Sequence, residues 1–228
     1  AAGCDVRPYL VKSPFQPQFE LDDARRVAES LGLTMTVVGI DILQDPDVGK
    51  NPPNRCYFCK KALFTRLREL GRSDGYDLLC DGTNASDDED DRPGMRALRE
   101  LGIRSPLREC GLTKPEIRRL SREAGLFTGE KPAYACLATR IPAGTEITAA
   151  MLQKVERAEE SLFAMGFSDF RVRYFSGAAK LQLPGEQFQI AMQRQKEIVS
   201  ALAPDFDAVL LDLSPRKTEE KTWNSNGL

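Results

Sequence analysis

Apolar and polar positions follow two different periodicities in the first part of the chain. Short runs rich in β-branched residues predict strands, and longer runs with apolar residues at helical spacing predict helices. The expected strands cover 9–12, 33–40 and 76–80, and the expected helices cover 19–31, 57–70 and 113–124. Gly32 would end the first helix, and Thr113 with Glu116 forms a capping-box pattern at the start of the last. Such alternation favours a parallel sheet covered on both faces.

The order of the expected helices and strands changes after Gly144. The expected order is a helix at 148–165, strands at 170–175 and 179–183, a helix at 186–202 and a strand at 208–213. We therefore predict an α/β protein with a doubly wound parallel sheet in residues 1–143 and a second, smaller α/β domain in 144–228. The polar tail after Pro215 is expected to be loosely held.

Composition and charge restrict the classes of function that the protein can have. Of 228 residues, 41% are hydrophobic and 29% charged, which is typical of a globular protein. Lys plus Arg number 32 and Asp plus Glu 34, so the net charge of -2 does not favour a nucleic-acid partner. The sequence has no apolar run long enough for a membrane span and no secretory signal, so we expect a cytoplasmic protein.

The sequence contains no histidine. This excludes a Ser-His-Asp triad, zinc sites with histidine ligands and an imidazole general base. Any catalysis must therefore use Cys, Asp, Glu, Lys, Arg or a cofactor.

Three of the six cysteines are candidates for chemistry. Cys56 and Cys59 form a CxxC pair at the start of a predicted helix, where the helix N-terminus and Arg55 favour thiolates. Structural zinc would need four ligands, and there is no second CxxC. With Cys136 as a third thiolate, the pair can hold three irons of a 4Fe–4S cluster and leave the fourth open. The alternatives are half-buried thiols and, for Cys136, a small buried apolar residue; packing roles are expected for Cys4, Cys80 and Cys110.

Polar residues follow several predicted strands, and ligands of parallel α/β folds bind at such strand ends. Ser13, Asp41 and the Asp81–Asn84 loop stand at these positions. In that loop, Gly82, Thr83 and Asn84 are candidates to approach a nucleotide, and the downstream carboxylates of Asp87 and Asp90 are candidates to hold Mg²⁺. The alternatives are an Asp-Gly turn and a solvated acidic run.

Arg171 and Arg173 are two residues apart on a predicted strand, so both side chains project from one face. Two guanidinium groups on one face can bind a phosphate or carboxylate. The alternative is the solvent face of a half-buried strand.

Taken together, several segments resemble the LarE family, which makes the sulfur-containing nickel-pincer cofactor of lactate racemase. The matches run in order from about Lys12 to Leu183. They are NPPNRCYFCKKALF, DGTNASDDEDDRPGMRALRELGIRSPL, GLTKPEIRRLSREAGL, KPAYACLATRIPAGT and FRVRYF.

The resemblance implies a PP-loop ATP pyrophosphatase fold and an ATP-dependent sulfurtransferase. ATP with Mg²⁺ would adenylate a carboxylate of a pyridinium biscarboxylic acid mononucleotide, and sulfur would then displace AMP to leave a thiocarboxylate. In one branch of the family a single cysteine gives up its sulfur and becomes dehydroalanine. In the other, three cysteines that match Cys56, Cys59 and Cys136 hold a 4Fe–4S cluster whose open iron carries a hydrosulfide. This chain has all three, which predicts the cluster branch with an external sulfide donor.

The resemblance also implies roles for single residues. Ser13, the Gly82–Asn84 loop and Arg140 would bind the nucleotide. Arg171, Arg173 and Glu159 would line the substrate pocket. Family members are homo-oligomers, and the same is expected here.

The chain departs from the family pattern at several positions, two of which concern ligand binding. The SGGxDS loop that binds the ATP phosphates is absent and is expected to precede Ala1. Gln182 and Ile190 stand where some members carry carboxylates proposed to bind metal. Two other functions are alternatives: a PP-loop tRNA thiolase, which would typically add zinc-binding cysteine pairs and basic surfaces, and a non-enzymatic nucleotide- or metal-binding scaffold.

Overall fold

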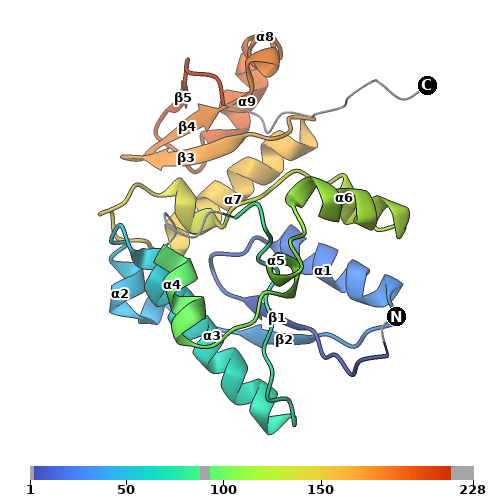
Figure 1. Cartoon of the computed structure of the whole chain (residues 1–228). Coiled ribbons are helices and arrows are strands. Elements are labelled where there is room, and N and C mark those ends of the chain that lie inside the picture. Colours follow the sequence, from blue (N-terminus) through green and yellow to red (C-terminus); the bar gives the residue numbers. More distant parts are fainter. Residues whose placement is uncertain (1–2, 88–92, 217–228) are drawn as a thin grey trace, which may run out of the picture. The chain divides into compact units, whose positions relative to one another are not determined.

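The computed structural model describes residues 3–87 and 93–216. The chain forms two compact units, one from Ala1–Ala138 with Ala143–Ala149 and the other from Thr139–Pro142 with Ala150–Leu228 (Figure 1). Among the described residues, no helix combines the length and apolar character needed to cross a membrane.

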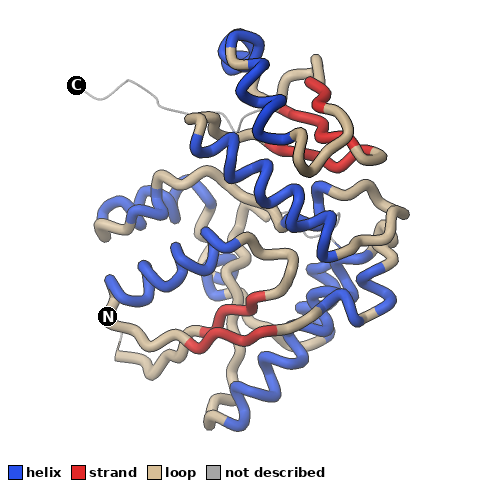
Figure 2. Tube along the Cα trace, turned by 180° about the vertical axis from the view of Figure 1, so that it is seen from behind, coloured by secondary structure: helices blue, strands red, loops and turns tan. Residues whose placement is uncertain are grey.

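The first unit contains a two-stranded parallel sheet. β1 (Tyr9–Lys12) pairs with β2 (Thr36–Gly39), with Tyr9 opposite Thr36 and Lys12 opposite Gly39. Helices α1 (Gln18–Ser30) and α3 (Arg55–Ser73) lie on opposite sides of these strands in both views (Figures 1 and 2). Because the strands are parallel, the residues that follow them meet at one edge, as the sequence predicts for Ser13 and Asp41.

Shorter helices complete this unit. They are η1 (Ile42–Gln44), α2 (Pro46–Gly49), α4 (Pro93–Glu100), α5 (Pro106–Glu109), α6 (Lys114–Glu123) and η2 (Phe127–Gly129), while η3 (Leu137–Arg140) leads from the first unit into the second. α3 packs against α4, and each contributes buried apolar side chains such as Leu63 and Leu98. These contacts remove apolar area from water and so stabilise the unit.

The predicted strand at 76–80 is reduced to one parallel bridge between Cys80 and Arg104. Leu78 in this segment is 64% exposed, so the apolar run is not the fully buried strand that it suggested. Within the described residues the first unit thus has a smaller parallel sheet than the doubly wound one expected from the sequence.

Both predicted helix-terminal signals are confirmed. Gly32 has φ +66°, and the following Leu33 amide donates to the Ala28 carbonyl at 2.9 Å, which closes the end of α1. At the start of α6, the Thr113 amide donates to the Glu116 carboxylate at 2.9 Å in a capping box.

The second unit is built on a mixed three-stranded sheet. β4 (Ala178–Gln182) lies between β3 (Arg171–Phe175), which is antiparallel to it, and β5 (Val209–Leu211), which is parallel to it. Val172, Ala179 and Leu181 are almost fully buried, as are Leu152, Val155 and Leu162 of the long helix α7 (Ala149–Ala164). This alternation leaves a polar face on the sheet, which carries the predicted arginines.

The single helix expected at 186–202 is divided into η4 (Gly185–Gln187), α8 (Phe188–Gln193) and α9 (Gln195–Leu202). Arg194 interrupts it with φ -99° and ψ 18°. Its guanidinium pairs locally with Glu197 and donates to the distant Met165 carbonyl, so a long-range hydrogen bond holds the residue at the break.

Candidate functional site

The first unit gathers three predicted site segments around Phe15, which is 1% exposed. Ser13 lies two residues earlier, directly after β1. The Phe15 carbonyl accepts from the Leu137 amide at 2.9 Å and so fixes the backbone next to Cys136. The Arg55 guanidinium lies 5.2 Å from the centre of the Phe15 ring, and its Nη2 is 3.8 Å from Cys56 Sγ. The strand-end loop and two of the candidate cysteines therefore share one neighbourhood.

Cys59 is electrostatically linked to the other two cysteines. The pKa of its thiol is raised to about 12, mainly by burial and next by the negative charge of Cys136; Arg55 opposes this rise, and Cys56 adds a smaller contribution. Cys59 and Cys136 are half-buried and Cys56 is exposed. Yet within residues 3–87 and 93–216 no three His, Cys, Asp or Glu side chains are gathered closely enough to hold a metal ion. The three thiols are thus neighbours that have not converged on a common ligand position.

The high pKa of Cys59 predicts slow alkylation. A rise from 9.0 to about 12 lowers the thiolate fraction at neutral pH about 1,000-fold, and only the thiolate attacks iodoacetamide. In the metal-free protein at about pH 7.5, peptide mass spectrometry should find Cys59 reacting at least about 100-fold more slowly than exposed Cys110. Raising the pH toward 10 should increase the alkylation rate of Cys59 continuously. Equal alkylation rates of Cys59 and Cys110 at neutral pH would show that Cys59 is not buried and that its pKa is not raised.

The Ser13 loop is held by its own side chains. Ser13 is 3% exposed, and its amide and hydroxyl both donate to Gln16 Oε1, at 3.0 and 2.7 Å. Its Oγ also accepts from the Phe15 amide at 3.2 Å. This closed turn keeps the chain compact at the carboxyl end of β1.

The Asp81–Asn84 loop is organised by carboxylates. Asp81 accepts from the Thr83 amide and hydroxyl and from the Ser105 hydroxyl at 2.6 Å. Asp87 accepts from the Asn84 amide at 3.0 Å, so it braces the loop from its other side. A side chain at Gly82 would meet nothing within 4 Å, so no protein contact requires glycine there. Asp90 lies outside the described residues.

The second unit holds a buried ion pair between Arg140 and Glu159, which are 1% and 2% exposed. The guanidinium binds both carboxylate oxygens, at 2.7 and 3.2 Å, and Nη1 also donates to the Thr139 hydroxyl at 2.8 Å. Glu159 Oε1 accepts from the Val172 amide at 2.9 Å as well. Glu159 therefore joins Arg140 to the edge of β3.

Arg171 and Arg173 lie on the same face of β3 and close to Arg140. Arg171 is 6% exposed and donates to the Phe170 carbonyl at 2.6 Å; burial, followed by the charges of Arg140 and Arg216, lowers its pKa to about 10. The same three causes lower the pKa of Arg173. Clustered guanidinium groups repel one another, and an anion bound among them would relieve that repulsion.

Sequence reasoning missed Arg216. We expected the segment after Pro215 to be loose, but the Arg216 amide donates to the Leu183 carbonyl at 2.8 Å and its guanidinium pairs with Asp169 at 3.1 Å. Asp169 directly precedes the buried Phe170–Arg171 pair. A basic residue just after the last predicted strand was the only available signal, and it does not reveal a partner 47 positions earlier.

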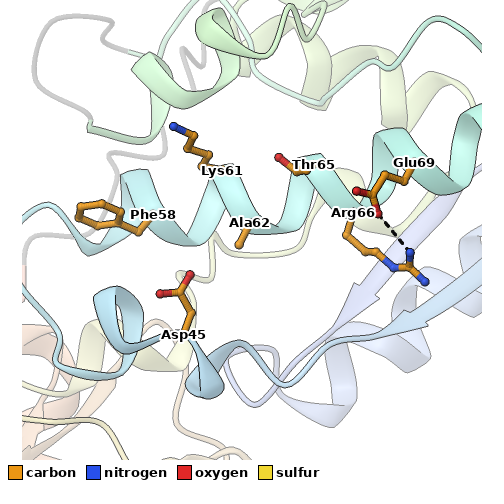
Figure 3. A pocket seen from close by; sticks show the side chains of 7 residues that line it. All are labelled: Asp45, Phe58, Lys61, Ala62, Thr65, Arg66 and Glu69. Carbon is orange, nitrogen blue, oxygen red and sulfur yellow. Dashed lines mark hydrogen bonds and ion pairs between the residues drawn. The ribbon is translucent and has the colours of Figure 1, made fainter.

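A pocket of about 380 Å³ opens along α3, beside the CxxC turn (Figure 3). Its lining residues are Asp45, Phe58, Lys61, Ala62, Thr65, Arg66 and Glu69, none of which is a predicted site residue. Both of its cations already have carboxylate neighbours, since Arg66 lies 3.2 Å from Glu69 and Lys61 lies 3.9 Å from Glu100. The pocket is therefore a poor anion site and is not part of the candidate site.

Comparison with known proteins places the chain in a family. No protein-family model matches it. It is 42% identical over 174 residues to an uncharacterized protein of Synechocystis sp., and 34% identical over 180 residues to the pyridinium-3,5-bisthiocarboxylic acid mononucleotide synthase of Lactiplantibacillus plantarum; these matches cover 76% and 79% of the chain. The chain spans 65% of the length of each of these two relatives.

A third relative, an uncharacterized protein of Methanocaldococcus jannaschii, is 30% identical over 204 residues, which cover 90% of this chain and 78% of that protein. The chain therefore belongs to the same family as these proteins, the LarE family that its motifs resemble.

Proposed function

We propose that this protein is an ATP-dependent sulfurtransferase that converts carboxylates of a pyridinium biscarboxylic acid mononucleotide into thiocarboxylates. The relative from Lactiplantibacillus plantarum is named as the synthase of the corresponding bisthiocarboxylic acid mononucleotide. The observation that carries the proposal is the meeting of Ser13, Cys56 and the Cys136 segment around Phe15. It supports a nucleotide site and a sulfur site within one unit.

The first chemical step would be activation of the carboxylate. A carboxylate oxygen attacks the α-phosphorus of ATP, pyrophosphate leaves, and an acyl adenylate forms. A sulfur nucleophile then attacks the acyl carbon, a C–S bond forms, and the C–O bond to AMP breaks, so AMP leaves with the electron pair. Sulfur is nucleophilic as thiolate or hydrosulfide, so the absence of histidine from the sequence does not hinder this step.

The fold proposed for this chemistry is the PP-loop type of doubly wound sheet. Parallel β1 and β2, helices α1 and α3 on opposite sides of them, and the parallel bridge at Cys80 all support it (Figure 1). In such a sheet the Ser13 turn and the Asp81–Asn84 loop are strand-end segments suited to a nucleotide. Gly82 leaves the loop backbone open to a ligand.

The second unit would bind the substrate's anionic groups. Arg171 and Arg173 share one face of β3, and Arg140 is held beside them by Glu159. The substrate carries a phosphate and carboxylates, which guanidinium groups bind with charge-assisted hydrogen bonds. Glu159 in this scheme positions Arg140 rather than contacting the substrate.

For the sulfur source we propose a 4Fe–4S cluster held by Cys56, Cys59 and Cys136. The donor set suits it, because three neighbouring thiols can ligate three irons. Bound there, the cluster would supply a sulfur nucleophile at its remaining iron. Since Cys59 has a pKa of about 12, holding the cluster would require its thiol to lose the proton, and the three sulfurs would have to lie closer together than they do in this structure.

The function is tested by anaerobic turnover. The full-length protein, reconstituted with iron and sulfide, is incubated with ATP, Mg²⁺ and the biscarboxylic acid mononucleotide, and products are identified by mass spectrometry. We expect AMP, pyrophosphate and a thiocarboxylate in equal amounts. AMP and pyrophosphate without a thiocarboxylate would contradict sulfur transfer, and no reaction at all would favour a binding scaffold.

A further inference from the structure

The polar face of the second unit contains a chain of hydrogen bonds that ends on Arg173. Arg173 Nε donates to Gln182 Oε1, Gln182 Nε2 donates to Asp212 Oδ2 at 3.0 Å, and Lys180 Nζ lies 2.9 Å from the same oxygen. The strand register places these groups together, because Arg171 is opposite Gln182 and Arg173 is opposite Lys180. Opposed residues of antiparallel strands share a face.

The Gln182 amide can be oriented in only one way here. Its oxygen faces a guanidinium and its NH₂ group faces a carboxylate, whereas a flipped amide would set donor against donor and acceptor against acceptor. Asp212 is firmly ionised, because hydrogen bonds from Gln182, Lys180 and the Ser214 amide lower its pKa to about 2. The ionised Asp212 thus fixes the orientation of the Gln182 amide, and Gln182 in turn fixes the position of the Arg173 guanidinium.

The two arginines next to Thr139 differ in charge balance. The buried Arg140 is neutralised by Glu159 through two contacts. Arg173 instead donates to the Gln182 amide oxygen and, at 2.8 Å, to the Thr139 carbonyl, both of which are neutral acceptors. Among residues 3–87 and 93–216 no carboxylate forms an ion pair with Arg173. Its positive charge is therefore fixed in position without a directly contacting carboxylate, although Asp212 and Glu159 attract it from farther away.

We propose that Gln182 is a positioning residue that aims Arg173 at an anionic group of the substrate while leaving the charge of Arg173 available. A carboxylate at this position, which some family members carry, would pair with the guanidinium directly and reduce its net charge, whereas the glutamine of this chain does not. The inference rests on the proposed function, since the ligand concerned is the phosphate or a carboxylate of the pyridinium mononucleotide.

The test compares Gln182→Glu with the wild-type full-length protein by calorimetric titration of pyridinium-3,5-biscarboxylic acid mononucleotide and, separately, of AMP. The substitution keeps the shape of the side chain and adds one negative charge beside Arg173. We expect the Kd of the mononucleotide to rise about 10-fold or more and that of AMP to stay within about twofold. In turnover, KM should rise with little change in kcat, a split that a general folding defect would not produce.

Two further variants serve as controls. Gln189→Glu adds the same charge at an exposed position of α8 and should bind the mononucleotide like the wild type. Gln182→Met removes the hydrogen bonds without adding charge, so its loss of affinity should be smaller than that of Gln182→Glu. Unchanged mononucleotide affinity in Gln182→Glu, or an equal loss in Gln182→Met, would overturn the role of charge. If the wild type itself does not bind the mononucleotide, both this inference and the proposed function fail.

Discussion

Replacing Cys136 with serine is expected to abolish thiocarboxylate formation, with a loss of about 1,000-fold or more. In the proposed function the Cys136 sulfur is either a cluster ligand or the transferred atom itself, and serine can be neither. AMP binding should survive, because the Phe15 carbonyl holds the adjacent backbone through the Leu137 amide and not through the cysteine side chain. The measurement is anaerobic turnover followed by mass spectrometry of the mononucleotide.

The same experiment on the CxxC pair separates the two sulfur sources. If a cluster supplies the sulfur, Cys56→Ser and Cys59→Ser should lose activity as completely as Cys136→Ser. If Cys136 gives up its own sulfur, the two CxxC variants should retain most of theirs. Cys110→Ser is the matched control, since Cys110 is exposed and has no assigned role. Full activity of Cys136→Ser would rule out both sources.

Replacing Glu159 with alanine is expected to lower the free energy of unfolding by about 3–5 kcal/mol. The change leaves the guanidinium of Arg140, which is 1% exposed, without its carboxylate, and removes the acceptor of the Val172 amide. A buried charge without a partner is far more costly than the intact pair. Urea denaturation followed by circular dichroism would measure the change.

The neighbouring Glu160→Ala gives the control, because Glu160 lies on the same helix and is exposed. Its effect should stay within about 0.5 kcal/mol. The double variant Arg140→Met with Glu159→Leu should recover part of the lost stability, since it removes both buried charges. A small effect of Glu159→Ala would mean that water reaches Arg140 and that the pair is not buried.

Local patterns predicted much of the fold. The strand at Tyr9–Lys12 was placed correctly, and the helix at 57–70 was found within α3 (Arg55–Ser73). These elements depend on apolar spacing and on local signals such as Gly32 and the Thr113 capping box, which neighbouring residues determine. The strand at 33–40 shortened to Thr36–Gly39, because β1 offers only four partners.

Features that depend on contacts between distant residues were either not predicted or predicted wrongly. The run at 76–80 has strand-like composition but pairs only at Cys80, and the helix at 186–202 breaks where Arg194 reaches the Met165 carbonyl. The link between Arg216 and Asp169 and the Gln182 hydrogen bonds join positions far apart in the sequence. No local pattern encodes such partners. A single sequence therefore indicates candidate residues but not the contacts that position their side chains or neutralise their charges.

We propose above that external sulfide reaches the substrate through a cluster at Cys56, Cys59 and Cys136. It is tested most directly by anaerobic turnover with isotopically labelled sulfide, with the masses of product and intact protein measured together. We predict labelled thiocarboxylate in excess over protein and an unchanged protein mass after turnover. Unlabelled product limited to one sulfur per chain, with dehydroalanine at position 136, would contradict the claim.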